Sequence, residues 1–478
     1  MTHISPAGDT HHRSAGRAAG PLEAINLPLP VTLIQKYNRP VPRYTSYPTV
    51  PHWQPEAPTQ QQWITALNHR LAVNRDIGLY VHLPFCEQLC TYCGCNKRIT
   101  KNHGVEHPYV DAVLAELSLY RDALHLRPRL KELHLGGGTP TFLSPDALAR
   151  LIDGITERID VAETVSFSFE AHPHSTTVDH LKTLRARGFN RISVGVQDFS
   201  PHIMELINRR QTTEEVERTT YEAQALGYSV NYDLIYGLPG QRLEDTVETM
   251  QRVDTLRPDR IAYYGYAHVP WFSPGQRAYS EADVPQGQER WDLYATGRAM
   301  LESSGYHDIG LDHFALPEDE LTQAHHSGKL HRNFMGYTTS QAAVTIALGC
   351  SAIGDCWDTY VQNEKKVEDY QRTVLEEQRL PLVKGHTLTN NDQTIRRHIL
   401  NLMCHGRTQW RPQHLRCEAI DRAVNHWNEM AADGLLRRSP YSVEVTPAGR
   451  PFLRNICLPL DDHYWHRQPT VPTFSNAL

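Results

Sequence analysis

The chain has 478 residues, of which 40% are hydrophobic and 21% charged, a composition ordinary for a globular protein. Its formal net charge of −6 provides no positive field for nucleic acid or an anionic membrane, so neither is expected as a partner. The length suffices for one large α/β domain and a smaller second domain.

The first residues are rich in Gly, Ala, Ser and His and contain no apolar stretch of the kind found in secretory signals. We therefore expect residues 1–30 to be disordered and residues 31–76 to form an N-terminal extension that packs on the main domain. No apolar run reaches the roughly 18 residues of a membrane span. Four of the nine cysteines crowd between residues 86 and 95, unlike a secreted disulfide framework, and a cytoplasmic protein is expected.

Between residues 77 and 270 the sequence alternates short β-rich runs with loops and amphipathic helices. The six predicted strands are Ile77–Leu83, Glu132–Leu135, Thr164–Glu170, Arg191–Val196, Ser229–Ile235 and Arg260–Tyr266. Six successive βα units predict parallel strands with right-handed crossovers, which close or partly close into a barrel.

The helices between these strands have recognisable starts, apolar faces and ends. Pro108 is expected at a first helical position, and Thr212 with Glu215 forms a capping box. Gly227 and Pro258 end two helices. The expected core-facing residues are Val110, Val113, Leu114 and Leu117 in one helix and Leu243, Val247 and Met250 in another.

The sequence changes character after residue 365. We expect residues 77–365 to form the barrel domain with its extension, and residues 366–478 to form a C-terminal helical domain. Two helices are predicted near Asn390–Cys404 and Ala419–Asp433, followed by a hairpin that includes Tyr441–Val445. This order is typical of a winged-helix-like module. Such modules often bind DNA, but the lack of a densely basic helix favours a structural lid.

Three cysteines, Cys86, Cys90 and Cys93, follow the first predicted strand with spacings of three and two residues. Three thiolates at this spacing can hold three irons of a 4Fe–4S cluster and leave the fourth iron without a protein ligand. The amino and carboxylate groups of S-adenosylmethionine can chelate that iron, and one electron from the cluster then releases a 5′-deoxyadenosyl radical. The sequence therefore predicts a radical S-adenosylmethionine (radical SAM) enzyme.

Other uses of these cysteines fit less well. A zinc site usually pairs two knuckles, and no second knuckle or histidine pair lies nearby in the sequence. Cys90 and Cys93 alone would match a thioredoxin-type redox site. A ferredoxin-type cluster needs a fourth ligand, for which Cys95 is a candidate, although alternate side chains of Cys-Gly-Cys tend to diverge from one iron.

Polar residues recur at the carboxyl ends of the predicted strands, where parallel α/β barrels gather their chemistry. The glycine-rich run Gly136–Thr139 lets backbone approach a ligand closely and presents amide groups to it. Glu170 can accept ribose hydroxyls or an ammonium group. Later strand ends carry Gln197, Asp198, Asp233 and His268. A structural hydrogen bond explains each of them equally well, and only their coincidence on one rim favours a ligand site.

Recognisable segments run along nearly the whole chain. They are Pro42–Thr49, Cys86–Lys97, Gly136–Thr141, Ser193–Phe199, Asn208–Arg209, Asp233–Pro239, Tyr266–His268, Gly310–Phe314, Leu330–Thr339 and Arg454–Cys457. In these segments the chain resembles the oxygen-independent coproporphyrinogen III oxidases (coproporphyrinogen dehydrogenases) of heme biosynthesis. Cys95 supports the resemblance, because related heme chaperones usually lack a cysteine there.

The resemblance implies an α/β fold: a radical SAM partial (βα)6-type barrel with a mainly helical, winged-helix-like C-terminal domain. It implies one 4Fe–4S cluster and two molecules of S-adenosylmethionine. Such an enzyme oxidatively decarboxylates two propionates of coproporphyrinogen III to vinyl groups, giving protoporphyrinogen IX. A low-potential donor such as a flavodoxin or ferredoxin would reduce the cluster, and the chain would act as a monomer.

The resemblance also assigns site residues by position. The contacts implied for the cluster-bound S-adenosylmethionine are Tyr80, Gly137, Glu170 and Ile353. Those implied for the second molecule are Tyr92, Gly138, Thr139, Gln197, Arg209, Asp233 and Ala267. Arg209 could pair bidentately with a carboxylate, and Asp233 could hold an ammonium group. Cys86, Cys90 and Cys93 would ligate the metal, whereas Cys95 would be a catalytic candidate that does not ligate the cluster.

One run, Ser340–Cys350, departs from the family pattern, and it would affect the choice of substrate if it faced the porphyrinogen. The register of Ile353 depends on this run. Two other functions stay open on the sequence alone: a heme-binding chaperone of the same superfamily, and a radical SAM enzyme acting on another tetrapyrrole. Cys95, Arg209 and Gln197 favour the oxidase.

Overall fold

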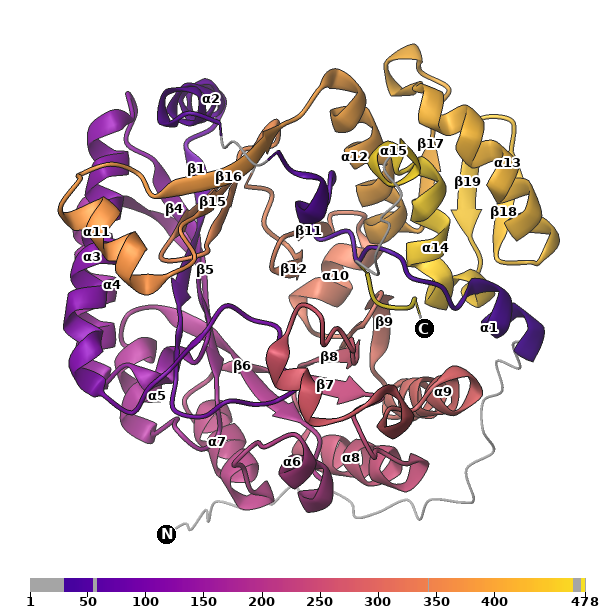
Figure 1. The fold of residues 1–478 in the computed structure, drawn as a ribbon, viewed down its shortest axis with the longest axis horizontal. Coiled ribbons are helices and arrows are strands. Elements are labelled where there is room, and N and C mark those ends of the chain that lie inside the picture. Colours follow the sequence, from indigo (N-terminus) through magenta and orange to yellow (C-terminus); the bar gives the residue numbers. More distant parts are fainter. Residues whose placement is uncertain (1–29, 55–57, 343, 467–473, 478) are drawn as a thin grey trace, which may run out of the picture.

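The computed structural model describes residues 30–54, 58–342, 344–466 and 474–477. The predicted disordered segment 1–30 therefore lies outside the described residues, apart from its last residue. Figure 1 shows a curved sheet with helices along its outer side and a second group of helices, from the C-terminal part of the chain, packed beside it.

A sheet of twelve strands forms the body of the structure, in the order β16-β15-β14-β13-β1-β4-β5-β6-β7-β8-β10-β9. From β1 to β8, neighbouring strands are parallel. These strands are β1 (Asp76–Leu83), β4 (Arg129–Gly137), β5 (Asp160–Ala171), β6 (Phe189–Gln197), β7 (Ser229–Tyr236) and β8 (Arg260–Gly265). All six predicted strands are confirmed, with ends shifted by a few residues.

Helices on the outer side of the sheet separate these strands (Figure 1). They are α3 (Glu106–Ala123), α4 (Pro145–Arg158), α5 (Val178–Arg185), α6 (Pro201–Leu206), α7 (Thr213–Ala225), α8 (Leu243–Leu256) and α9 (Gly287–Ser303). The predicted capping box of Thr212 and Glu215 starts α7, and Gly227 follows its end with a φ of +78°. The predicted stripe on α3 is buried.

Two details of the helix predictions are wrong. α3 begins at Glu106, so Pro108 is its third residue rather than its first. The buried Glu106 carboxylate accepts a hydrogen bond from the Ser144 N–H at 2.9 Å. Ser144 caps the start of α4, so this contact stabilises the first turn of α3, which includes Glu106. Leu243 is 43% exposed, because it is the first residue of α8 and the buried face of that helix begins one turn later.

Residues that follow β8 extend the sheet at both edges. The added strands are β9 (His307–Gly310), β10 (His313–Ala315), β13 (Thr345–Leu348), β14 (Ile353–Asp355), β15 (Thr359–Asn363) and β16 (Leu382–Thr387). β13 runs parallel to β1, with Leu79 opposite Ile346 and Val81 opposite Leu348. The run that departs from the family pattern therefore contains a buried strand, and this burial explains its apolar residues.

The C-terminal residues pair a small sheet with several helices, in the order predicted for a winged-helix-like module. The strands β17 (Arg407–Gln409), β18 (Leu436–Ser439) and β19 (Ser442–Val445) are antiparallel in the order β17-β19-β18. The helices are α12 (Asn390–His405), α13 (Glu418–Ala432), α14 (Leu453–Cys457) and α15 (Asp462–His466). Both predicted helices and the predicted hairpin strand are confirmed. Trp427 is fully buried, and its indole N–H donates to the Ile456 carbonyl, so the module has its own packed centre.

Shorter elements connect these parts. They are α1 (Val31–Tyr37), α2 (Gln60–Val73), β2 (Phe85–Cys86), β3 (Arg98–Ile99), α10 (Glu320–His326), β11 (His331–Asn333), β12 (Gly336–Thr338) and α11 (Val367–Leu375). The N-terminal segment bridges the barrel and the C-terminal module. Tyr37 donates to Asp433 of the module at 2.6 Å, and Arg43 donates to the Gly265 carbonyl of the barrel at 2.6 Å.

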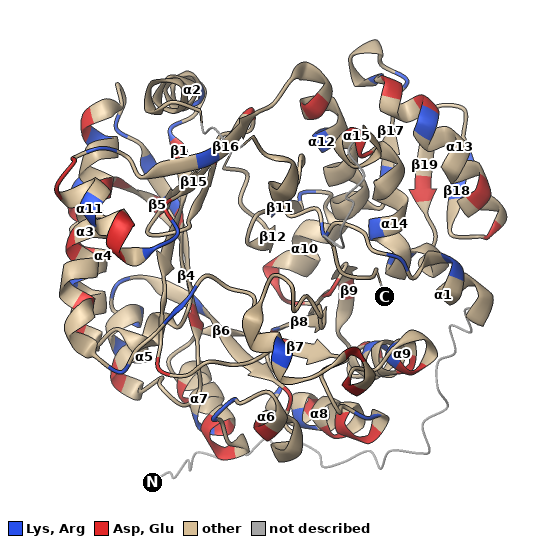
Figure 2. Ribbon diagram, in the orientation of Figure 1, with Lys and Arg blue, Asp and Glu red and all other residues tan. Residues whose placement is uncertain are grey.

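Charged residues lie mainly on the outer helices, where both signs are interspersed (Figure 2). This pattern agrees with the small net charge. Within the residues that the structure describes, no helix combines the length and apolarity needed to cross a bilayer.

Candidate active site

The carboxyl ends of the six parallel strands meet at one rim of the sheet, which borders a cavity of about 810 Å³. The cavity wall carries Cys86, Cys90, Cys93 and Cys95 from the loop after β1. It also carries eight of the eleven predicted cofactor contacts, namely Tyr92, Gly137, Gly138, Thr139, Glu170, Gln197, Arg209 and Asp233. Cysteines and predicted contacts therefore share one cavity.

The cysteine-bearing loop is held in place by contacts that use no thiol. The Thr91 N–H donates to the Ile207 carbonyl at 3.0 Å. The side-chain amide of Asn208 donates to the Leu89 carbonyl at 2.7 Å. Because the segment after α6 anchors the loop through backbone groups, the thiols stay available as ligands.

The thiols have hydrogen-bond donors beside them. Cys86 Sγ lies 3.4 Å from Thr139 Oγ1, and Arg209 Nη1 lies 3.6 Å from Cys90 Sγ. All nine cysteines of the chain are free of disulfides. Three thiols on one loop, with donors that can bond to cluster sulfur, are a donor set that fits a 4Fe–4S cluster.

Cys93 and Cys95 interact directly. The hydrogen bond from Cys95 lowers the pKa of Cys93 to about 6, and the nearby Lys97 ammonium contributes to this shift. The same contact raises the pKa of Cys95 well above its usual value. The two thiols therefore titrate as a pair. That Cys93 ligates the cluster and Cys95 does not stays a prediction.

Glycines at the end of β4 allow the backbone to pass close to the cysteine loop. Gly137 has a φ of +117°, and its N–H donates to Glu170 Oε2 at 3.1 Å. A Cβ atom on Gly138 would lie 2.6 Å from the carbonyl carbon of Pro84, and one on Gly137 would lie 2.7 Å from the His82 ring. Side chains at these positions would push the loop away from the rim.

Glu170 is held at the end of β5 by groups on neighbouring strands. His134 Nε2 lies 3.4 Å from Glu170 Oε1, and the Tyr80 ring stacks on His134 with ring centres 5.9 Å apart. Burial would raise the pKa of Glu170, but His134 and the Gly137 N–H outweigh it and lower that pKa below its usual value. The carboxylate is therefore ionised at neutral pH and can accept hydrogen bonds from a ligand.

Asp233 is the second acidic group of the rim. The Ser193 hydroxyl donates to its Oδ2 at 2.9 Å, and the Asn231 amide donates to its Oδ1 at 3.0 Å. Burial and the negative charge of Glu170 raise the pKa of Asp233 to about 6. A cationic ligand would lower this pKa again, so the carboxylate is suited to bind an ammonium group.

Arg209 supplies the positive charge of the rim. Its guanidinium donates to the Gly195 carbonyl and to Gln211, the latter at 3.0 Å. Its Nη1 lies 3.5 Å from the Tyr92 hydroxyl. Beside it, Gln197 is buried and has a φ of +69°, a left-handed conformation that is costly for a residue other than glycine. Such strain is common at ligand sites.

Three predicted contacts are placed elsewhere in the described part of the chain. Tyr80 stacks on the His134 ring, and its hydroxyl lies 3.1 Å from His82 Nδ1. The Ala267 carbonyl accepts from Gln276 Nε2 at 3.1 Å, and the same amide also donates to the carbonyl of Tyr92 in the cysteine loop. Ile353 starts β14, which lies two strands from β1 in the sheet, and it packs against a cluster that includes Trp53 and Tyr360. Whether these three contact a cofactor stays a prediction.

The cavity also contains residues to which sequence reasoning assigned no role. They include His172, His174, Ser193, Asn208, Arg210 and Tyr264. Ser193 shares its strand face with Gly195, so strand alternation would have found it. His134 was missed for another reason: its partner Glu170 lies 36 positions away on the neighbouring strand, and no local pattern reports this pairing.

An incomplete parallel barrel with a CxxxCxxC loop after its first strand defines a radical SAM enzyme, and the family model of the radical SAM superfamily matches residues 80–253. Over nearly its whole length the chain is also similar to particular members. It is 38% identical to the oxygen-independent coproporphyrinogen III oxidase of Escherichia coli (strain K12). The alignment covers 94% of this chain and 98% of the relative. It is 36% identical to the oxygen-independent coproporphyrinogen III oxidase of Synechocystis sp., and this alignment covers 93% of the chain and 97% of the relative. The chain belongs to the family of oxygen-independent coproporphyrinogen III oxidases.

A solved structure agrees with this assignment. The coproporphyrinogen III oxidase (HemN) from Escherichia coli, described as a radical SAM enzyme, superposes with a TM-score of 0.84 at 36% identity. The match covers 91% of this chain and 99% of that chain, so it includes both the barrel and the C-terminal module.

Proposed function

We propose that this chain converts coproporphyrinogen III to protoporphyrinogen IX without oxygen, by oxidative decarboxylation of two propionate side chains to vinyl groups. The observation that carries the proposal is the shared cavity, whose wall holds four cysteines and eight predicted cofactor contacts. The substrate follows from the named relatives, which match over nearly the whole chain.

We assign Cys86, Cys90 and Cys93 as the cluster ligands. When bound, the 4Fe–4S cluster and S-adenosylmethionine supply a 5′-deoxyadenosyl radical, which takes a hydrogen atom from the β-carbon of a propionate. The substrate then loses CO2 and passes one electron to an acceptor. Cys95 lies beside Cys93, and it stays the candidate for a catalytic role.

The two acidic groups of the rim suggest how two molecules of S-adenosylmethionine divide the cavity. Glu170 is ionised and would accept hydrogen bonds from the cluster-bound molecule, together with Tyr80, Gly137 and Ile353. Asp233 would hold the ammonium group of the second molecule, and Arg209 its carboxylate. The other residues proposed for the second molecule are Tyr92, Gly138, Thr139, Gln197 and Ala267.

Two cations on the cavity wall suit the substrate. Lys101 and Arg210 line the cavity and are exposed, so they add positive charge without an obligatory structural role. The substrate carries several propionate carboxylates, and exposed cations at the mouth of the cavity would hold those that do not react.

We further propose that a low-potential flavodoxin or ferredoxin reduces the cluster and that the chain acts as a cytoplasmic monomer. We propose the domain boundaries given by the sequence: an extension over 31–76, a barrel domain over 77–365 and a C-terminal domain over 366–478. The small sheet packed on α12 and α13 supports a separate C-terminal unit.

The test is product analysis after anaerobic turnover. Protein with a reconstituted cluster is incubated with reductant, S-adenosylmethionine and coproporphyrinogen III, and the products are analysed by mass spectrometry. Loss of two CO2 per substrate, with formation of 5′-deoxyadenosine, is expected. A methylated or linear tetrapyrrole would replace the proposal with another radical reaction. Tight heme binding without 5′-deoxyadenosine would replace it with a chaperone function.

A further inference from the structure

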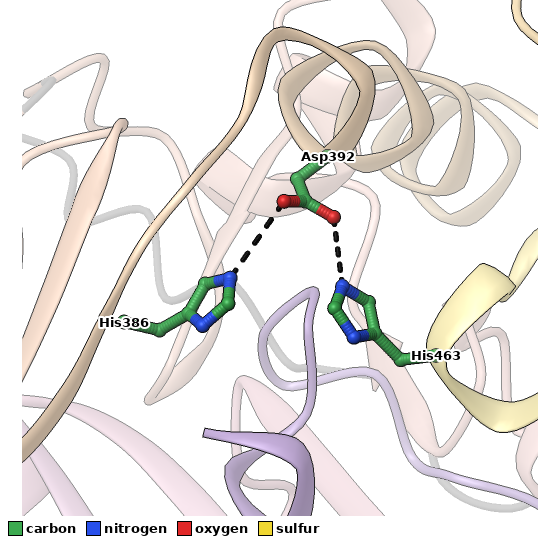
Figure 3. A group of neighbouring side chains, drawn as sticks. All are labelled: His386, Asp392 and His463. Carbon is green, nitrogen blue, oxygen red and sulfur yellow. Dashed lines mark hydrogen bonds and ion pairs between the residues drawn. The ribbon is translucent and has the colours of Figure 1, made fainter. Parts of the chain in front are cut away.

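Outside the catalytic cavity, three side chains with metal-binding groups converge where the large sheet meets the C-terminal module. His386 lies on β16, Asp392 in the first turn of α12, and His463 on α15. One ligand atom from each residue lies within 4.8 Å of the other two. Figure 3 shows the two imidazole rings directed at the two oxygens of the carboxylate from either side.

The two histidines contact the carboxylate unequally. His463 Nε2 lies 2.8 Å from Asp392 Oδ1, a normal hydrogen-bond distance, whereas His386 Nε2 lies 3.6 Å from Oδ2, too far for one. Only 8% of the His386 side chain is exposed. Within the described part of the chain, neither of its ring nitrogens has a hydrogen-bond partner. An imidazole buried in this way needs a bonding partner for its nitrogen.

We propose that His386, Asp392 and His463 bind one divalent transition-metal ion, and that zinc is the ion this set suits best. Zinc takes imidazole nitrogen at about 2.0–2.1 Å and carboxylate oxygen at about 2.0–2.2 Å, usually with four ligands. Two imidazoles and one carboxylate supply three, and a water can complete the tetrahedron. Calcium and magnesium prefer all-oxygen sites, so two imidazoles exclude them as the intended ion.

The geometry requires only small movements. Ligand atoms of a tetrahedral zinc site lie about 3.3–3.5 Å apart, so a separation of 4.8 Å closes by roughly 1.4 Å on binding, and the 2.8 Å contact between His463 and Asp392 opens by roughly 0.6 Å. Rotation of the imidazole rings about their side-chain bonds supplies such a movement. The backbone segments that carry the three residues therefore stay in place.

The carboxylate at the centre of the site is already oriented. The backbone N–H and the hydroxyl of Thr389 donate to Asp392 Oδ2 at 2.9 and 2.7 Å. These bonds leave Oδ1, the oxygen that faces His463, to bind an ion. The His463 ring is itself held edge-on by Tyr47, with ring centres 5.8 Å apart. Groups that orient metal ligands in this way are a regular part of metal sites.

The position of the site points to a structural role. The three residues belong to β16, α12 and α15, and His463 is separated from Asp392 by 71 positions in the chain. An ion here would join the edge of the large sheet to the first and last helices of the C-terminal module. It would stabilise the folded protein without taking part in the radical reaction, because binding to the folded state alone favours that state.

The first test is zinc binding by the full-length protein with its iron–sulfur cluster in place. Zinc affinity is measured by competition with a chromogenic chelator for the natural chain, for His386→Leu and for His463→Phe. The matched control is His405→Ala, which removes an exposed histidine at the other end of α12. We expect one tightly bound zinc in the natural chain and in the control. Loss of an orienting group alone weakens metal sites about 10–100-fold, so each ligand variant should lose at least about 100-fold in affinity.

A second measurement covers the case in which the ligand variants fold poorly. Crystals of the natural chain are soaked in zinc chloride, and anomalous difference maps are calculated from data above and below the zinc absorption edge. This contrast separates zinc from cluster iron. A peak between the three side chains supports the proposal. The proposal fails if zinc appears only at the cysteine loop or not at all, or if His386→Leu and His463→Phe bind zinc as tightly as His405→Ala does.

Discussion

Two buried arginines show how differently the rim of the barrel and the junction with the C-terminal module use the same side chain. Arg209 on the rim and Arg454 on α14 are each 8% exposed. The Arg454 guanidinium donates to five backbone carbonyls, those of Val41, Pro42, Ser475, Asn476 and Ala477. Arg209 instead donates to Gly195 and Gln211 and keeps Nη1 beside the thiol of Cys90.

The surroundings of the two guanidiniums differ in charge as well. Burial lowers the pKa of Arg454 to about 9, and the positive charge of Arg43 adds to this shift. Burial would lower that of Arg209 too, but the Tyr92 hydroxyl and the Cys90 thiol raise the pKa above its usual value. The two arginines are therefore equally buried but have different roles. Arg454 joins chain segments, and Arg209 remains available to a negatively charged ligand.

The largest effect is expected when one of the three cysteine ligands on the rim is removed. Cys86→Ala, Cys90→Ala or Cys93→Ala should abolish the 4Fe–4S cluster, since each takes away one of three thiolate ligands. Cys95→Ala should retain the cluster, because Cys86, Cys90 and Cys93 still supply three thiolates. Iron content and visible absorption of anaerobically purified protein check this. If Cys95→Ala loses iron as completely as the other three, the ligand assignment is wrong.

The next effect concerns the junction. Arg454→Met leaves five carbonyls without their shared donor, and we expect the free energy of unfolding to fall by at least about 3 kcal/mol. Denaturant unfolding measures this loss. The rim should be unaffected, so cluster content per folded molecule should match that of the natural chain. A change below about 1 kcal/mol, close to the effect of an ordinary single substitution, would contradict the role assigned to Arg454.

The matched change on the rim should do the opposite. Arg209→Lys keeps a positive charge but loses the planar pair of donors, so kcat/KM for S-adenosylmethionine should fall about 10–100-fold. Stability should change little, since a lysine can still reach a carbonyl of the rim. Steady-state kinetics and unfolding curves are both needed. A variant with normal kinetics but reduced stability would place Arg209 in the same class as Arg454.

The smallest expected effect is a pH dependence of the folded protein's stability, which comes from Asp233 on the rim. The pKa of Asp233 in the folded chain is about 6, above its ordinary value of 3.8. Ionising it therefore costs stability as pH rises from about 4 to 6, and the full cost of about 3 kcal/mol persists above pH 6. Asp233→Asn removes this cost.

The variant should therefore be more stable than the natural chain at pH 7.5, with a gap that shrinks as pH falls toward 5. It should also bind S-adenosylmethionine more weakly, because the ammonium group loses its partner. Unfolding curves over this pH range and binding measurements check both. A gap that does not depend on pH would show that Asp233 is not the titrating group.

Much of the barrel could be predicted because its signals are local. Six strands of four to eight residues alternate with capped helices, and the cysteine spacing stands directly after the first strand. Eight predicted contacts share one cavity because they lie near the carboxyl ends of strands or in the loops that follow them, and parallel strands end at the same edge.

What the sequence could not predict depends on contacts between distant segments. The apolar run at 344–348 reads as a departure from the family pattern, but it is the strand that pairs with β1. His134 and Glu170 meet only through strand register. Leu243 lies at an expected apolar position, yet it is exposed because α8 meets the sheet one turn further on. Patterns along the chain do not specify which residues of two elements come together.

The parallel pairing of β13 with β1 has a consequence for biosynthesis. β1 leads into the cysteine loop, yet one of its two edges is covered only by residues 345–348, which are made after β8 is complete. While the ribosome adds the intervening 260 or so residues, this edge lacks its native partner and can pair with other chains. Chaperones that cover exposed strand edges are therefore expected to raise the yield of folded protein.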